Sequence, residues 1–295
     1  MRPLAVVLFL ALLPAPAVAY RSETLQHLTF LAAKTFNRCV EGTTIPRLSA
    51  LEVRNLVAGN LAEADPNFLR RMTRWSYYDR EDGDGRRVLG LVSTRLHDRF
   101  EERAEQVLDP TPVRDVRRYE DLGTVLHYLQ AVTIPADVVP IFHPRPWRWP
   151  AGDRFSNYPV DTERLAEAVS GLCLEVLATP EDATLEQLLD RTAAATIRAI
   201  RSPIADMDAT WHAFFEEAEP GRFGSYGPAG NSFGRAARFP CGEVECRLLD
   251  DDPIYQDFAL AQHRLAVLAT MRAVLLLQRF FVERGGNAVS ADRNR

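Results

Sequence analysis

The sequence contains almost no lysine. Its 35 basic residues are all arginine except Lys34. We interpret this bias as a mark of GC-rich coding and infer no function from it. Asp and Glu together number 40, so the formal net charge is −5. A weakly acidic chain has no strong global field that would attract it to nucleic acid or to an anionic membrane, although a local basic patch still could.

The chain also lacks alternating strand patterns, internal repeats and low-complexity linkers. Helical spacing of apolar residues dominates instead. We expect helices over 23–37, 50–61, 86–108, 119–133, 161–177, 184–201, 206–218 and 254–284. Irregular segments are expected over 135–159 and 219–253. The sequence therefore predicts an all-α fold, with one domain over residues 20–285 and a disordered polar tail over 286–295.

Long apolar runs are confined to the start of the chain. Arg2 is followed by the apolar run from Leu4 to Leu13, and a small-x-small cleavage motif occupies Ala17–Ala19. This pattern is typical of a secretory signal peptide over residues 1–19, which would leave Tyr20 as the mature N-terminus. No later stretch reaches the length expected of a membrane helix. We therefore expect no transmembrane segment, and an exported protein of a bacterial periplasm or medium.

Cysteine is scarce, with four residues in 295. An even number in an exported chain favours disulfides. The segment CGEVEC makes Cys241 and Cys246 the natural pair and leaves Cys39 to Cys173. The alternative, a cysteine metal site, is less favoured because the chain has no C-x-x-C motif and no histidine near these cysteines.

Four segments carry a resemblance to a known family. In order, they are Tyr20 with HLTFLAAK, AGNLAEAD, RWSYYDRE, and LHYLQAVTIPADV followed by GDRFSNY. The order of these segments and their amino-acid sequences resemble those of the zinc-dependent phospholipase C and fungal single-strand nuclease superfamily. The resemblance implies a secreted all-α protein that hydrolyses phosphodiesters. Clustered zinc ions suit that reaction because they generate a hydroxide and neutralise charge on the phosphoryl oxygens.

The resemblance assigns several residues of this chain to the metal site. Tyr20 takes the place of the N-terminal residue that chelates zinc through its amine and carbonyl, where the family usually has tryptophan. His27 resembles the first histidine ligand, and His127 resembles the first ligand of the H-x-x-x-D helix. Asp65 resembles the acid that binds or lies beside the metals, which makes it the catalytic candidate. Imidazole and carboxylate groups are the ligands that such zinc ions accept.

The family pattern fails at five further positions. Ala131 replaces the acid that bridges two zinc ions, and Ser76 replaces a histidine. Asp137 stands at another histidine position, where it could still bind metal. Gly152 and Ser156 replace the final H-x-x-x-E pair. Because each lost ligand costs about a hundredfold in affinity, we expect at most a reduced zinc site of about one ion, or none.

The segment FHPRPWRWP at 142–150 is the most unusual loop. Arg145, Trp147 and Arg148 combine guanidinium and indole groups, which suit phosphate binding and stacking on a base, or contact with a membrane interface. The alternative is a proline-stiffened loop whose tryptophans cover the helices while its arginines pair with surface acids.

The candidate ligands also have ordinary structural interpretations. His27 and His127 on apolar helix faces resemble satisfied core histidines, and Asp65 could simply end a helix. His143 and Asp153 lie in the adjacent loop and are candidates to replace lost ligands. The remaining histidines are interpreted as surface or packing residues, namely His97, His212 and His263.

These observations favour an exported protein of the phospholipase C and nuclease type with an eroded metal site. It would be non-catalytic or weakly active, and would bind a phosphate-containing ligand or a protein partner. The alternative is an active metal-dependent phosphodiester hydrolase with a reduced, one-metal site. A third class, a purely structural helical domain that binds partners, would have no cleft at the position of the candidate metal ligands.

Overall fold

The computed structural model describes most of the chain after residue 19. The described residues are 20, 22–64, 78, 87–88, 92–93, 96–108, 117–139, 141, 153–217, 223–249 and 251–293. The predicted signal peptide, Asp65, Ser76 and the arginine–tryptophan segment with Arg145, Trp147 and Arg148 lie outside these residues.

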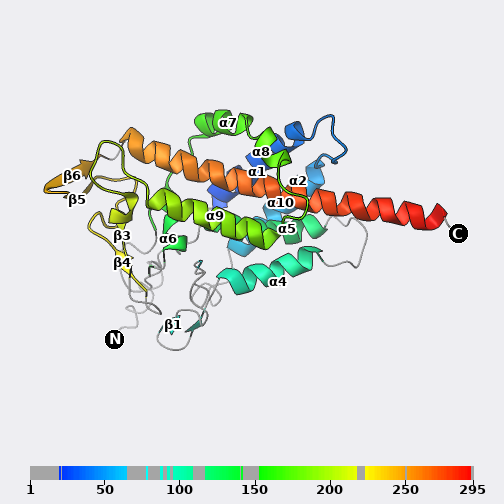
Figure 1. Cartoon of the computed structure of the whole chain (residues 1–295), viewed down its shortest axis with the longest axis horizontal. Coiled ribbons are helices and arrows are strands. Elements are labelled where there is room, and N and C mark those ends of the chain that lie inside the picture. The colour runs from blue at the N-terminus through cyan, green and yellow to red at the C-terminus, as the bar shows by residue number, and fades with distance from the viewer. Residues whose placement is uncertain are drawn as a thin grey trace, which may run out of the picture.

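Helices make up most of the described chain (Figure 1). They are α1 (Ser22–Cys39), α2 (Ala50–Ala64), α4 (Leu96–Leu108), α5 (Arg117–Ala131), α6 (Pro135–Val138), α7 (Thr162–Ser170), α8 (Cys173–Leu177), α9 (Leu185–Ile200) and α10 (Pro253–Arg293), with 3-10 turns η2 (Phe155–Asn157) and η3 (Trp211–Phe214). The sequence predicted an all-α fold, and the described chain is mainly helical with short strand pairs.

The described strands form three antiparallel pairs. They are β1 (Arg87–Val88) with β2 (Val92–Ser93), β3 (Phe215–Glu216) with β4 (Ser225–Tyr226), and β5 (Ala237–Cys241) with β6 (Val244–Leu248). The sequence analysis found no strand alternation, and for β5 this was wrong. Ala237, Phe239 and Cys241 are buried, whereas Arg238 and Pro240 are exposed. The pattern spans only five residues and includes a proline, which normally argues against a strand.

Side chains cap the helices at the starts predicted from the sequence. Ser49 and Glu52 form a reciprocal capping box before α2, with N···O distances of 2.6 and 3.3 Å. Asp161 accepts a hydrogen bond from the backbone of Arg164 and begins α7. Thr184 forms a second capping box and begins α9. Such caps satisfy backbone N–H groups that have no partner within the helix.

Helices α2 and α5 cross at two glycines. A Cβ atom on Gly59 would collide with the carbonyl of Glu120, and one on Gly123 would collide with the carbonyl of Leu56. The two backbones can approach this closely only because neither crossing residue has a side chain. The crossing fixes the helix that carries His127.

A polar network links four helices inside the bundle. Asn60 on α2 donates to Thr29 on α1 at 2.9 Å and to Gln130 on α5 at 3.0 Å. Gln130 in turn donates to Thr29 and to Thr270 on α10, both at 3.0 Å. All four side chains are buried. A connected buried network of this kind specifies how the four helices align.

Helix α10 runs along the molecule from the β5–β6 hairpin to the C-terminus (Figure 1) and packs against α1, α5, α7 and α9. Contrary to the sequence analysis, its Pro253–Glu283 segment is long and apolar enough to cross a membrane. More than half of its most apolar window is buried within the fold, as in the core helix of a globular protein. The helix also continues past Gly285 to Arg293, beyond the end predicted at residue 284.

Three other predicted helices have different boundaries. The helix expected over 86–108 begins at Leu96, after the β1–β2 pair. The helix expected over 161–177 is divided by a turn at Gly171 and Leu172 into α7 and α8. The segment 206–218 forms η3 and β3 instead of a helix, because Trp211 and Phe214 turn into an aromatic cluster.

Two disulfides complete the fold, and they form the predicted pairs. Cys39 at the end of α1 is bonded to Cys173 at the start of α8, 134 residues away. Cys241 and Cys246 join the β5–β6 hairpin. Disulfides are typical of an oxidising, exported compartment.

Candidate functional site

Tyr20 lies at the centre of the candidate site. Its side chain is fully buried, and its hydroxyl oxygen is 3.1 Å from Oγ1 of Thr133, just after α5. Because Thr133 already donates to the carbonyl of Gln130, the phenol is the donor in this bond. The ring packs against Phe155 of η2 and His263 of α10, with centroid distances of 6.1 and 5.5 Å.

Two carboxylates lie near the Tyr20 ring. Burial raises the pKa of the Tyr20 phenol above its ordinary value, and the charges of Asp137 and Asp153 act in the same direction. Asp137 belongs to α6, and both aspartates are about 5% exposed or less. The structure thus places Asp137, one of the sequence-predicted ligands, within electrostatic range of the Tyr20 phenol.

Asp153 has a structural role in this arrangement. One carboxylate oxygen accepts the backbone N–H of Ser156 at 3.1 Å, and the other accepts the hydroxyl of Tyr226 at 2.9 Å. The hydroxyl of Ser156, a position that the resemblance aligns with an acidic ligand, donates to the Asp153 carbonyl at 2.7 Å. These bonds hold Asp153 against the η2 turn and attach it to β4.

Two histidines, one of which contacts the Tyr20 ring, also belong to this region. His27 of α1 and His263 of α10 are close enough to interact electrostatically. Among the described residues, neither Nε2 atom has a hydrogen-bond partner, and both atoms are buried. Burial, reinforced by the neighbouring charge of His27, lowers the pKa of His263 to about 4. His263 is therefore neutral at physiological pH.

His127 lies within the packed face of α5. It is 6% exposed, and its ring contacts that of Tyr128 at a centroid distance of 5.4 Å. Ala131, one helical turn further along, is 2% exposed. Among the described residues, His27, His127 and Asp137 do not bring three ligand atoms within 4.8 Å of one another. Asp65 lies outside the described residues.

A group of three potential ligands does occur elsewhere. His97 and Glu101 of α4 and Glu186 of α9 place one ligand atom each within 4.8 Å of one another. The Nε2 atom of His97 is 3.2 Å from the Glu101 carboxylate and 3.5 Å from that of Glu186. Both glutamates are more than half exposed, which is usual for a surface ion pair that joins two helices.

A small cavity adjoins the Tyr20 cluster. Its volume is about 10 Å³, close to the minimum that holds one water molecule. Asp153, Tyr226 and Asn231 supply the polar part of its wall. Aromatic rings supply most of the remainder, namely Phe155, Trp211, Phe214, Phe215, Phe233 and Phe258. A substrate would not fit here without movement of these rings.

The sequence analysis missed several residues of this cluster. His263 was interpreted as an ordinary packing residue, and nothing in its surroundings in the sequence signals that it faces His27. Thr133 and Tyr226 were not predicted as site residues, because a single hydroxyl residue forms no spacing pattern in a sequence. By contrast, Tyr20, Asp137 and Asp153 were identified from the family resemblance or from their position in the loop.

The described site resembles a packed interior more than a catalytic cleft. The rings of Tyr20, Phe155 and His263 contact one another and join η2 to α10, and both carboxylate oxygens of Asp153 accept hydrogen bonds within the fold. Comparisons with protein-family models, with curated proteins and with solved structures found no match.

Proposed function

We propose that this chain is an exported, non-catalytic binding protein related to the phospholipase C and nuclease type. In this proposal, the ancestral metal cleft has become part of the protein core. The protein then acts by binding a phosphate-containing ligand or a protein partner elsewhere on its surface. The proposal rests on the family resemblance in the sequence together with the packing of the residues that the resemblance assigns to the site.

The observation that carries the proposal is the position of the Tyr20 ring. The Tyr20 side chain is fully buried and packs against Phe155 and His263. Its hydroxyl is bonded to Thr133, and Asp137 lies close by. A trinuclear site needs these positions to face an open, charged cavity, because the ions and the phosphodiester must both enter.

A second observation concerns the positions of the lost ligands. Ala131 and Ser156, where the family has acids, are both buried. Ser156 caps a turn through its hydrogen bonds to Asp153. Restoring acids at such positions would bury uncompensated charge, which is costly. The substitutions therefore suit a stable core better than they suit catalysis.

The test is hydrolysis of a generic phosphodiester, bis(p-nitrophenyl) phosphate, by the exported protein with and without added zinc. We expect no turnover above the rate of a zinc-containing blank. Turnover that requires zinc, that a chelator removes and that His127→Ala abolishes would overturn the proposal. It would instead support the alternative, a hydrolase with a reduced metal site. His212→Ala, at a partly exposed position on η3, is the matched control variant.

A further inference from the structure

A second cavity lies far from Tyr20 in the sequence, where the turn after α8 meets α9 and α10. Its volume is about 310 Å³, which is at the lower end of the range for small-molecule sites. Its wall is formed by Ala178, Thr179, Pro180, Ala183, Thr184, Leu188, Arg191, Arg272 and Leu276. Arg191 and Arg272 are the two charged residues in that wall.

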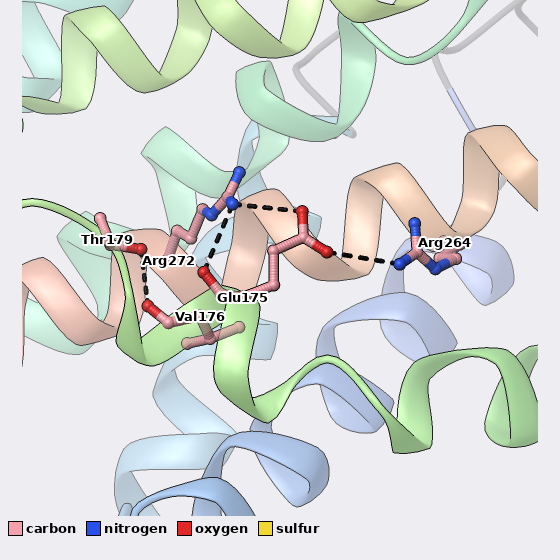
Figure 2. A network of polar contacts seen from close by, with 5 residues as sticks. All are labelled: Glu175, Val176, Thr179, Arg264 and Arg272. Carbon is pink, nitrogen blue, oxygen red and sulfur yellow. Dashed lines mark hydrogen bonds and ion pairs between the residues drawn. The ribbon is translucent and has the colours of Figure 1, made fainter.

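The charges around this cavity are unbalanced. Arg272 donates from Nη2 to the carboxylate of Glu175 at 3.2 Å and to its carbonyl at 3.4 Å (Figure 2). Arg264 contacts the same carboxylate at 3.4 Å (Figure 2). Among the described residues, Arg191 makes no hydrogen bond or ion pair. Two guanidinium groups therefore share the Glu175 carboxylate, and the third, that of Arg191, contacts no carboxylate among the described residues.

The hydrogen-bonding capacity of Arg272 is only partly used. Its buried Nε atom has no partner among the described residues, and only Nη2 contacts Glu175. Burial lowers the pKa of Arg272. The Glu175 carboxylate raises this pKa, whereas Arg191 and Arg264 lower it further. The local environment of Arg272 thus contains unneutralised positive charge, which a bound anion would compensate.

The other polar groups of the wall are engaged within the protein. The Thr179 hydroxyl donates to the Val176 carbonyl at 2.6 Å (Figure 2). The Thr179 carbonyl accepts from Arg279 at 2.7 Å, and the Thr184 hydroxyl caps α9. The guanidinium groups are therefore the donors left for a ligand. Aliphatic residues supply most of the remaining wall, so any ligand would meet cationic donors beside an apolar surface.

We propose that this cavity binds a small amphiphilic anion. Its headgroup, a carboxylate or a phosphate monoester, lies between Arg191 and Arg272, where planar guanidinium forks suit either oxyanion. Its short hydrocarbon part contacts Ala178, Leu188 and Leu276. This inference does not depend on the loss of catalysis proposed for the Tyr20 region, because no residue is shared between the two places.

The test is calorimetric titration of the exported protein with hexanoate, hexyl phosphate and inorganic phosphate at constant ionic strength. We expect one equivalent of at least one hexyl ligand to bind, and inorganic phosphate to bind at least tenfold more weakly. The comparison of the two hexyl compounds identifies the headgroup. Failure of both to bind at millimolar concentration would overturn the proposal. Equal affinity for inorganic phosphate would also overturn it, because the apolar wall would then contribute nothing.

Single substitutions test whether the anion binds in this cavity. Arg191→Gln should weaken binding of the preferred hexyl ligand at least tenfold without changing the midpoint of thermal unfolding, because Arg191 is exposed and has no partner to lose. Arg198→Gln, two turns further along α9 and also exposed, is the matched control and should leave affinity unchanged. Ala183→Leu should weaken binding by filling the cavity. Equal effects of Arg191→Gln and Arg198→Gln would show that the anion binds by general charge and would overturn the proposal.

Discussion

At the scale of single residues, the described contacts of Tyr20 are those of a core side chain. The family resemblance concerns its backbone amine and carbonyl, which the side-chain contacts do not address. The structure buries its ring beside Phe155 and His263 and bonds its hydroxyl to Thr133. A buried tyrosine whose hydroxyl finds a partner is a stabilising part of a core. We therefore attribute a structural role to Tyr20.

Removing the Tyr20 hydroxyl should measure that role. Tyr20→Phe keeps the ring contacts but loses the hydrogen bond to Thr133, which should lower the free energy of unfolding by about 1 kcal/mol. Tyr158→Phe is the matched control, because among the described residues the Tyr158 hydroxyl has no hydrogen bond. Urea denaturation checks both variants. Equal losses of less than about 0.5 kcal/mol would show that the bond to Thr133 contributes nothing.

His263 should make stability depend on pH. Its pKa is lowered to about 4 in the folded protein, against about 6.5 in an unfolded chain. Between these values the unfolded state binds more protons, so stability falls as the pH is lowered from 6.5 to 4. The full effect is about 3 kcal/mol. In His263→Gln this contribution disappears, and urea denaturation at several pH values should show a shallower decline.

A suitable control for this pH dependence is His212→Gln, at a less buried position where the ring nitrogen faces Glu217. All samples should contain a chelator, so that metal binding to His27 does not enter the measurement. If wild-type protein and His263→Gln lose stability in parallel as the pH falls, His263 is not the group that titrates.

At the scale of elements, the crossing of α2 and α5 determines where His127 and Gln130 lie. Gly59 and Gly123 allow the two backbones to touch, and the network around Asn60 then fixes their alignment. The position of His127 on α5 thus depends on the packing of Gly59, Gly123 and Asn60 at the crossing of the two helices.

Gly59→Ala should separate these helices. Its new Cβ would collide with the Glu120 carbonyl, a backbone atom that moves only with its helix. We expect a loss of about 1–3 kcal/mol in the free energy of unfolding, as for other overpacked cores. Gly171→Ala is the matched control, because nothing lies within 4 Å of a Cβ placed there. A Gly59→Ala protein as stable as the control would mean that the helices do not cross this closely.

Sequence patterns predicted these elements well where local chemistry determines them. The caps at Ser49, Asp161 and Thr184 depend on residues three positions apart, so the starts of these helices could be predicted from the sequence. The C-terminal end of α10 was predicted less well. A glycine such as Gly285 normally ends a helix, yet α10 continues beyond it. The β5 strand was missed because its pairing with β6 is a tertiary feature that five residues hardly reveal.

The candidate site was predictable only in part, for a related reason. A family resemblance marks positions in the chain, but whether those positions converge depends on packing. Tyr20, Asp137 and Asp153 interact electrostatically in the fold. His27 and His263 also interact, because α1 packs against α10. The contacts of Thr133 and Tyr226 likewise come from the tertiary fold.

At the scale of the whole molecule, α10 packs against α1, α5, α7, α8 and α9, and one disulfide holds α1 against α8. The long apolar α10 is thus explained by burial within the bundle. Cys39 and Cys173 close a loop of 134 residues in sequence separation, whereas Cys241 and Cys246 are separated by five. The two bonds should therefore contribute unequally to stability.

Removing each disulfide tests that inequality. The chain-entropy relation predicts a loss of about 5 kcal/mol for a double Cys39→Ser, Cys173→Ser variant and about 2 kcal/mol for Cys241→Ser, Cys246→Ser. Guanidinium denaturation of the two variants provides the measurement, and each variant serves as the control for the other. A larger loss from the hairpin bond would show that it supports more of the fold than β5 and β6.

The most direct test of the central claim is the zinc content of the exported protein, purified without chelators and measured by elemental analysis. If the former metal positions now form core, zinc should be far below one ion per chain, and His27→Ala should not change it. About one zinc per chain that survives dialysis, and that His27→Ala or His127→Ala removes, would contradict this account. The protein would then retain a working, reduced metal site.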